Sequence, residues 1–390
     1  MARVPEVTAE LLERVRQLRR ELHRHPEPGF AEHRTAARAA GWLRRLGLHV
    51  REGVAGTGVV GLLGEVGPVV ALRADMDGLP IAEQTGLPYA SQTPGWMHAC
   101  GHDGHVAVLL GAAELLARAG PLPGRVKFIL QPAEEEGGGA RRLVEAGALA
   151  DPPVEAVFAL HAKPCLPVGS IEVEEVPNAA CDAFDAAIVG QGGHAAGPHL
   201  ALDPLPAACH LVAALHTLVG RRAAPFEKAV VTVGALRAGE RRNVIPERAE
   251  LRGTLRTREP AVRSRLMQAM EALCRKIPEA FGLRAEFSWG ESTPRVKNDS
   301  RMLERVRRVG RAVLGASAVR EGAENSMGGE DFAFFLAEQG GVPGCLFGLG
   351  TGGTEGLHSP RFDFGDEAPA VGMRMFAGLV LDCLDTREER

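Results

Sequence analysis

The stretch "RVKFILQPAEEEGGGARRLVEAGALADPPVEAVFALHA", residues 125–162, changes its pattern twice. Residues 125–133 and 156–162 are apolar runs rich in β-branched and aromatic side chains, which is typical of buried strands. Between them, residues 140–149 have apolar side chains at helical spacing. A strand, a helix and a second strand in this order predict a parallel sheet with helices packed against it.

The same alternation extends toward the N-terminus. Residues 59–66 and 69–75 are expected to be strands, and residues 105–119 an amphipathic or buried helix. Regular alternation of strands and helices is typical of the α/β class. We therefore expect a mainly parallel sheet with helices on both faces.

The pattern changes near Cys181, where a second kind of domain begins. Strand-like and helix-like segments then follow in the order β-α-β-β-α-β, at residues 181–190, 203–222, 228–239, 248–257, 259–281 and 283–292. This order fits a two-layer α+β domain of the split βαβ, ferredoxin-like kind. Segments after residue 300 again need a sheet to pack on, so the small domain is expected to be an insertion. We assign residues 1–180 and 296–390 to the larger domain and residues 181–295 to the insertion.

Composition and charge exclude several classes of protein. The chain has 390 residues, of which 45% are hydrophobic and 24% charged, with a formal net charge of −4. This length suits two domains, and the charge gives no general attraction to nucleic acid. Neither a signal-peptide pattern nor an apolar run of about 18 residues is found, so we expect a cytoplasmic protein without a membrane partner. The seven cysteines form no CxxC pair, and no disulfide framework is expected.

Reactive side chains follow three of the expected strands. Asp75 and Asp77 follow one, the glutamates at 134–136 follow another, and His161 ends a third. In open parallel sheets, ligands bind beyond the carboxyl ends of the strands, so these groups are expected to meet in one crevice. The motif "HACGHDGH", residues 98–105, directly precedes a helix and is expected in the same layer.

The motif at 98–105 points to a metal site. Cys100 and His102 lie in a glycine-containing loop, and a thiolate, an imidazole and carboxylates together suit zinc, manganese, cobalt or nickel. The paired Cys/His spacing of a structural zinc site is missing. Two alternatives remain: a buried cysteine with helix-capping histidines, and Cys100 as a covalent nucleophile with His102 or His105 as its base. The second would leave the glutamates without a role.

Three consecutive glutamates by themselves are most often a solvated acidic run. Here an apolar strand leads into the run and three glycines follow it, so the backbone can turn sharply. Neighbouring carboxylates can then point in different directions, one to a metal and one to a water molecule. The spacing alone does not show which glutamate takes which role.

Other catalytic motifs are weak or missing. The string "GLGTGG", residues 348–353, matches GxGxxG, but no βαβ unit follows it, and a turn is expected there. The chain has no GxSxG elbow and no GK[ST] phosphate loop. An α/β-hydrolase and a dinucleotide-binding enzyme are therefore disfavoured.

With these residues in view, the chain resembles the M20 metallopeptidase and amidohydrolase family, and most closely its branch of N-acyl-amino-acid amidohydrolases, hippurate hydrolases and auxin-conjugate hydrolases. The resemblance rests on nine ordered blocks that run nearly from end to end. They are "ELHRHPEPGFAEHRTA" (21–36), "LRADMDGLPIAEQTGLPYAS" (72–91), "MHACGHDGHVAVLLGAA" (97–113), "FILQPAEEEGGGARRLVEAG" (128–147), "LHAKPCLPVGSI" (160–171), "GQGGHAAGPH" (190–199), "RRNVIPERAELRGTLRT" (241–257), "GGEDFAFF" (328–335) and "GLHSPRFDF" (356–364).

The resemblance implies a catalytic domain with two divalent metal ions, and a smaller inserted domain used for dimerisation and for closing over the substrate. A homodimer or higher homo-oligomer is expected on the same ground. The family pattern places the metal ligands at Cys100, His102, Glu135, His161 and His358. Cys100 would bridge the two ions, where other branches use an aspartate.

The resemblance also implies roles outside the ligand set. Glu134 would be the general base and acid, and Asp77 would orient a ligand. In the inserted domain, His194 would help polarise the scissile carbonyl and Asn243 would contact the substrate across a dimer interface. Both residues also fit ordinary turn chemistry.

A free carboxylate on the substrate is expected to need a cationic partner. Arg242, or its neighbour Arg241, stands beside Asn243 and is the candidate. Arginines next to a surface turn are common, so this assignment rests on position alone.

The glutamate block departs from the family pattern. The family has two glutamates followed by four glycines, whereas Glu136 here replaces the first glycine. In the expected register Glu134 is the acid/base and Glu135 the ligand, because "QPA" anchors the alignment upstream. A slip by one residue would move both roles to Glu135 and Glu136. His98, Asp103 and His105 are expected to support the loop without binding metal.

The expected reaction is metal-assisted hydrolysis of the amide that joins an acyl group to an amino acid or a short peptide. A carboxypeptidase or dipeptidase with the same site is the alternative within the hydrolases. A metal-dependent binding protein is a further alternative, but it would not need Glu134 beside the ligands. A cysteine-nucleophile enzyme would be inhibited by alkylation of Cys100 and indifferent to chelators.

Overall fold

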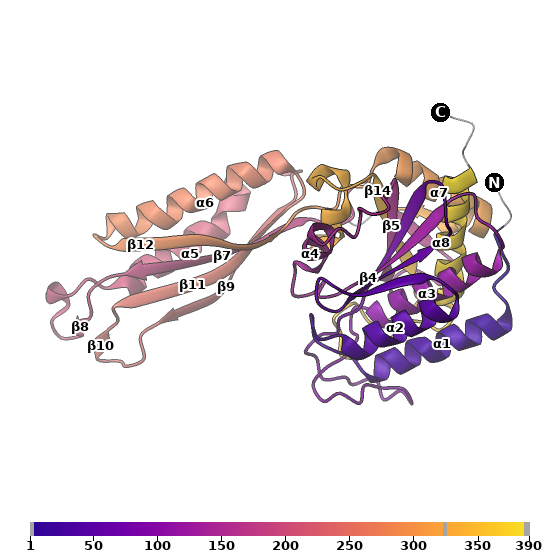
Figure 1. The fold of residues 1–390 in the computed structure, drawn as a ribbon. Helices are drawn as coiled ribbons and strands as arrows, with labels where there is room; N and C mark the ends of the chain where they lie inside the picture. The colour runs from indigo at the N-terminus through magenta and orange to yellow at the C-terminus, as the bar shows by residue number, and fades with distance from the viewer. Residues whose placement is uncertain (1–3, 323–325, 386–390) are drawn as a thin grey trace. The chain divides into compact units, whose positions relative to one another are not determined.

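The computed structural model describes residues 4–322 and 326–385. Contacts between residues divide the chain into two compact units. The first unit runs to Pro177 and resumes at Val296, and the second is Asn178–Arg295 with the short segment that ends at Glu330. Each unit has its own sheet and its own helices (Figure 1).

The first unit is built on an eight-stranded sheet. Across the sheet, the strands lie in the order β1 (His49–Val54), β2 (Gly58–Leu63), β4 (Arg125–Gln131), β3 (Val69–Asp75), β5 (Ala156–Lys163), β14 (Gly344–Gly350), β6 (Ile171–Val173) and β13 (Val319–Glu321). The central strands β4, β3, β5 and β14 are parallel, and β1, β2 and β6 add antiparallel pairs. The predicted mainly parallel sheet is confirmed.

Helices cover both faces of this sheet. One hydrophobic core lies under α1 (Ala9–Arg24), α2 (His33–Arg45), α3 (His102–Arg118), α7 (Ser300–Leu314) and α8 (Ala368–Asp385). The other core lies under α4 (Gly139–Glu145) and the 3₁₀ helix η3 (Asp331–Phe335). Two short 3₁₀ helices, η2 (Ala316–Ala318) and η4 (Ala337–Gln339), complete the unit.

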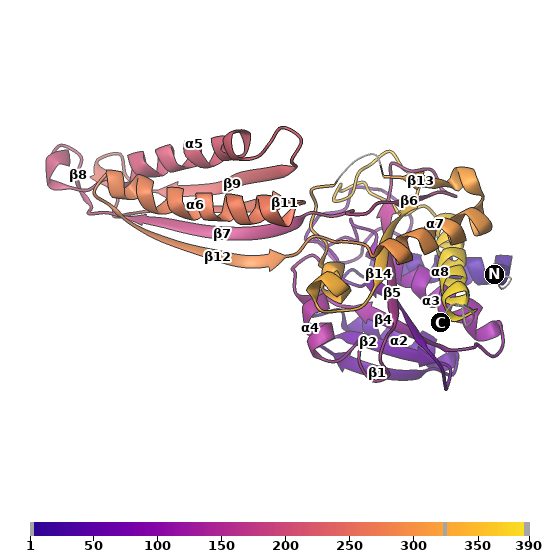
Figure 2. The same ribbon diagram turned by 90° about the horizontal axis from the view of Figure 1, so that it is seen from above.

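Helix α3 carries the "HDGH" part of the ligand motif on its first turn. Its side chains are buried without interruption from His102 to Leu116, because it packs against the sheet, α1 and α8. After this first turn the helix is mostly apolar around its whole circumference, and such a helix is typical of a buried position. Figures 1 and 2 both show α3 and α8 side by side.

The second unit has a four-stranded antiparallel sheet in the order β12 (Arg284–Thr293), β7 (Ala180–Val189), β11 (Arg248–Thr257) and β9 (Ala229–Ala238). Helices α5 (Pro204–Arg222) and α6 (Pro260–Ala280) pack against it. This is the expected split βαβ arrangement. A separate ribbon pairs β8 (Gly193–His194) with β10 (Val244–Ile245), and the 3₁₀ helix η1 (Pro198–Leu200) follows β8.

Within residues 4–322 and 326–385, no helix combines the length and the apolar character that crossing a membrane requires.

Candidate metal centre

The reactive side chains of the first unit meet at the carboxyl ends of the parallel strands. Asp75 is the last residue of β3, and the glutamate run follows the end of β4. His161 lies near the end of β5, and His102 is the first residue of α3. Parallel strands end at the same edge of a sheet, so residues far apart in the sequence come together here.

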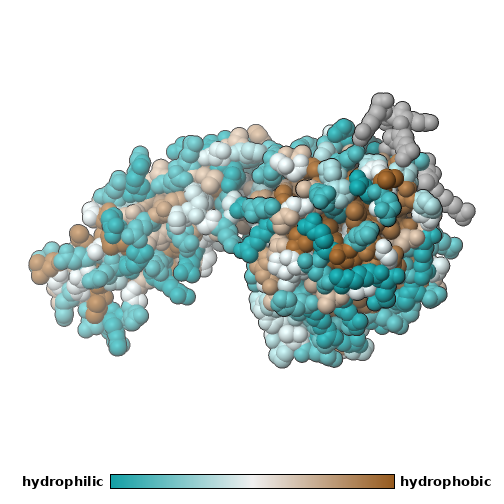
Figure 3. All heavy atoms as spheres, in the orientation of Figure 1, coloured by the Kyte–Doolittle hydropathy of each residue, from teal (hydrophilic) through white to brown (hydrophobic). Residues whose placement is uncertain are grey.

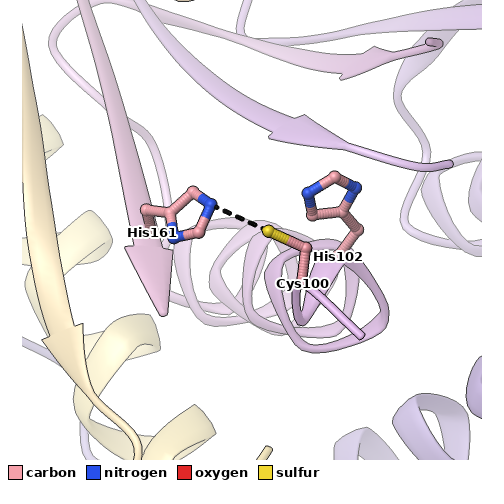
Figure 4. A group of neighbouring side chains, drawn as sticks. All are labelled: Cys100, His102 and His161. Atoms are coloured by element: carbon pink, nitrogen blue, oxygen red, sulfur yellow. Dashed lines mark hydrogen bonds between the residues drawn. The ribbon is translucent and has the colours of Figure 1, made fainter. Parts of the chain in front are cut away.

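Cys100, His102 and His161 form one group of ligand atoms (Figure 4). The three atoms lie within 4.8 Å of one another, and Cys100 Sγ is 3.4 Å from His161 Nε2. Gly101, between the first two residues, has φ +87°, a conformation that favours glycine. This turn brings a thiol and an imidazole from neighbouring positions to the same centre.

Cys100 also belongs to a second group, with Glu135 and His358. These three ligand atoms again lie within 4.8 Å of one another, and His358 Nε2 is 3.3 Å from Glu135 Oε1. The backbone N–H of His358 donates to the carbonyl of Ala99 at 2.8 Å, so the two loops are bound to each other. All five expected ligands are therefore brought together, and Cys100 is shared by the two groups.

The turn that carries the glutamates depends on its glycines. Gly137 and Gly138 have φ +78° and +88°, and a Cβ on Gly139 would lie 1.7 Å from the carbonyl oxygen of Pro132. The chain can therefore turn back immediately after β4. Glu134 and Glu135 are half-buried in this turn, whereas Glu136 is exposed.

Asp77 is bonded to two of the expected ligands. Its backbone carbonyl lies 2.9 Å from His102 Nδ1, and its carboxylate accepts the backbone N–H of Glu135 at 2.9 Å. The first contact fixes the hydrogen of His102 on Nδ1 and leaves Nε2 free for an ion. His102 Nε2 is buried and has no hydrogen-bond partner, which fits a position that a cation would fill.

The electrostatics of the cluster also fit a cation. Burial and the charge of Glu135 raise the pKa of Cys100 well above its ordinary value. A bound cation would favour the thiolate that burial disfavours. Burial and the neighbouring His105 lower the pKa of His161 to about 3, so its imidazole is neutral, as a metal ligand must be. Burial alone would lower the pKa of His102, but Asp75 and Asp77 raise it well above its ordinary value. A cation at Nε2 would take the place of the second proton that these carboxylates stabilise.

A buried network behind the cluster includes residues to which the sequence assigned no role. Arg73 donates to Asp75 at 2.7 Å and to Asp331 at 3.1 Å, and both side chains are buried. Asp75 Oδ1 is 2.6 Å from His105 Nδ1, and His105 Nε2 accepts the N–H of Ala162 at 2.9 Å. His105 thus supports the strand that carries His161. One feature of the sequence could have indicated this network: an arginine, Arg73, lies within the otherwise apolar run of β3.

The inserted unit carries the remaining candidates. His194 pairs with Val244 in the β8/β10 ribbon, and the N–H of Ala195 donates to the carbonyl of Asn243 at 3.2 Å. Arg242 is exposed beside them, as are the side chains of His194 and Asn243. The ribbon holds His194 and Asn243 close to each other, whereas all five expected ligands belong to the first unit.

The surface around this ribbon is partly apolar. Leu200, Leu202 and Val244 are exposed, and Figure 3 shows apolar atoms at the end of the second unit where β8 lies. Polar His194 and Asn243 therefore stand among exposed apolar side chains.

Residues 71–382 match the model of the peptidase family M20/M25/M40. The chain is 42% identical over 378 residues to the N-acetylcysteine deacetylase of Bacillus subtilis, a match that covers 96% of this chain and 97% of the relative. It is 36% identical over 369 residues to the N-acetyldiaminopimelate deacetylase of Halalkalibacterium halodurans, with 93% and 97% covered. It is 37% identical over 343 residues to thermostable carboxypeptidase 1 of Saccharolobus solfataricus, with 86% and 85% covered.

A solved structure is similar over the same length. The Bacillus subtilis YXEP protein, described as a dinuclear metal binding peptidase from the M20 family, superposes with a TM-score of 0.83 at 38% identity. The match covers 97% of this chain and 100% of that one. The chain belongs to the peptidase family M20/M25/M40 and is a hydrolase of that family.

Proposed function

We propose that this hydrolase uses two divalent metal ions to cleave the amide bond of N-acyl amino acids. The observation that carries the proposal is the pair of ligand groups that share Cys100, with Glu134 beside them. Zinc, manganese, cobalt and nickel suit this mixture of thiolate, imidazole and carboxylate.

The two groups support a division of the expected ligands between the two ions. Cys100, His102 and His161 would hold one ion, and Cys100, Glu135 and His358 the other. When bound, such ions polarise an amide carbonyl and make a water molecule more acidic. Glu136 is exposed, which favours the register in which Glu135 is the ligand.

Glu134 is the proposed acid and base. Its carboxylate offers an oxygen within 4.8 Å of ligand atoms of His102 and Glu135, and its Oε1 accepts the N–H of Asp331 at 3.4 Å. In this position Glu134 takes the proton from the attacking water and passes it to the leaving amine. His194 would stabilise the charge on the carbonyl oxygen, and Asn243 and Arg242 would contact the substrate.

The relatives support an amino-acid substrate. Two of them are named for removing acetyl groups from cysteine and from diaminopimelate, which are both amino acids. We therefore place N-acetyl and other N-acyl amino acids first. A carboxypeptidase is the second candidate, supported by the thermostable relative. We also propose that residues 181–295 mediate self-association.

The test uses chelator-stripped protein, with and without added zinc, manganese, cobalt or nickel. We expect hydrolysis of N-acetyl or N-benzoyl amino acids to return with metal, and Glu134→Ala to reduce kcat by about 10²- to 10⁴-fold. Glu136→Ala is the matched control from the same turn and should keep the wild-type rate.

Three outcomes would contradict the proposal. If chelation does not change the activity, the reaction does not depend on metal. If Glu134→Ala and Glu136→Ala lose kcat equally, Glu134 is not the specific acid and base. If the protein cleaves only dipeptides and no N-acyl amino acid, the carboxypeptidase function is the better assignment.

A further inference from the structure

The loop between α1 and α2 contains a buried carboxylate that the proposed reaction does not use. Glu32, the residue before α2, is fully buried. Its Oε1 accepts the backbone N–H of Ala133 at 2.7 Å, and its Oε2 accepts the hydroxyl of Thr57. The carboxylate therefore reaches a backbone amide 101 positions away in the chain.

Ala133 is the residue immediately before Glu134, and its backbone is strained. Its φ is +49°, in the left-handed region that residues with a Cβ adopt at a cost of about 1–2 kcal/mol. The hydrogen bond from its N–H to the buried Glu32 side chain can hold such a conformation. The conformation of Ala133 sets the direction in which the chain enters Glu134.

The loop also makes close contact with the rest of the glutamate turn. A Cβ on Gly29 would lie 2.9 Å from Ala133 Cβ and 3.1 Å from Glu136 Cδ. On the other side, the N–H of Asp331 contacts Glu134 Oε1 at 3.4 Å. The backbone before Glu134 and the carboxylate of Glu134 are thus held from two different parts of the chain.

We infer that Glu32 is a positioning residue for Glu134. Through the Ala133 amide it keeps the turn in the strained conformation that directs the Glu134 carboxylate toward the ligand cluster. The inference rests on the proposed function of Glu134. Because a displacement of about 1 Å in a reacting group can cost about 100-fold in rate, loss of this bond should act on turnover.

Three variants of the metal-loaded enzyme separate this role from folding. Glu32→Met keeps the size of the side chain but accepts no hydrogen bond, and we expect kcat to fall about 10- to 100-fold with KM unchanged. Glu32→Gln keeps an acceptor for Ala133 and should restore most of the rate. Thr57→Val removes the other partner of the same carboxylate and should keep kcat close to wild type.

A second readout does not depend on activity. Hydrogen–deuterium exchange at the Ala133 amide should accelerate in Glu32→Met and stay slow in Glu32→Gln and Thr57→Val. The metal content should be equal in all of them. If Glu32→Met does not fold, Glu32→Asp, which withdraws the carboxylate by one methylene, should show the same two effects.

Two results would overturn the inference: wild-type kcat in Glu32→Met with faster exchange at Ala133, or equal losses of kcat in Glu32→Met and Thr57→Val. A wild-type protein that cleaves none of the substrates would instead contradict the proposed function. Exchange at Ala133 would still report the hydrogen bond in that case, so the two failures can be told apart.

Discussion

At the scale of single residues, Asp103 shows how charge is balanced next to an expected ligand. It follows His102 directly and is fully buried. Its Oδ2 lies 2.9 Å from His23 Nδ1 and 3.7 Å from Arg19, both on α1. Arg19 also donates to Asp363 at 2.9 Å. Removing one member of a buried ion pair leaves an uncompensated charge, so α1 supports the loops that carry the ligands.

This network predicts a pH-dependent stability that depends on His23. Burial alone would lower the pKa of His23, but Asp103 and Glu83 raise it to about 9, against about 6.5 in an unfolded chain. The folded state therefore binds this proton more tightly. The resulting stabilisation is complete below pH 6.5 and is lost as the pH rises through 9.

To test this, the free energy of unfolding in denaturant is measured at a series of pH values between 6.5 and 9, with chelator present. We expect His23 to contribute a decrease of up to about 1.4 kcal/mol per pH unit, which His23→Gln should abolish. His33→Gln, at an exposed position on α2, should keep the decrease. Equal pH slopes in the wild type and His23→Gln would refute the assignment.

At the scale of elements, α3 fixes the "HDGH" segment by packing closely against two other helices. A Cβ on Gly111 would lie 2.2 Å from Met373 Sδ on α8 and 2.9 Å from Val15 Cγ2 on α1. Glycine is unfavourable in the middle of a helix, so its presence here reflects the close approach of α8 and α1. The position of His102 therefore depends on the packing of the whole helix.

Gly111→Ala and Gly41→Ala test this packing. Alanine normally stabilises a helix relative to glycine by about 0.5–1 kcal/mol. We expect this gain in Gly41→Ala on α2, where the nearest atom to the new Cβ is Arg45 Nη1 at 3.9 Å. Gly111→Ala should instead lower the free energy of unfolding by about 1–3 kcal/mol, because the new methyl overpacks the interface. A gain of stability in both variants would show that α3 is not closely packed.

At the scale of the whole molecule, the two units have separate hydrophobic cores. Every expected ligand belongs to the first unit. The sheet and helices of the second unit share one core of their own, which includes Phe184, Leu211 and Leu266. A ligand that binds only one folded unit stabilises that unit and not the other.

We therefore expect a chelator to act on one unit only. Adding metal at about 1,000 times its Kd should stabilise the first unit by about 4 kcal/mol. Hydrogen–deuterium exchange with and without chelator should differ in peptides from α3 and β5 and be the same in peptides from α5 and α6. Equal changes in both groups of peptides would show that the units unfold together or that metal binds elsewhere.

The sequence by itself determined the α/β class, the change of pattern near Cys181 and the family resemblance. Strand and helix periodicity is a local property, and the ligand-type side chains stand in short motifs at the ends of apolar runs. The expected ligands were therefore recognisable one motif at a time. The orienting role of Asp77 stays a prediction, and the structure adds its hydrogen bond to the Glu135 amide.

Only the tertiary structure shows which buried side chains contact and support the residues of these motifs. Arg73, Asp331 and Glu32 are ordinary charged residues in the sequence, and only the fold buries them. Arg73 donates to Gln131, 58 positions away, and to Asp331, 258 positions away. Glu32 accepts from Ala133, 101 positions away. Such contacts arise from the packing of loops and strands that are distant in the chain, and no local pattern records them. The left-handed conformation of Ala133 likewise follows from what surrounds it.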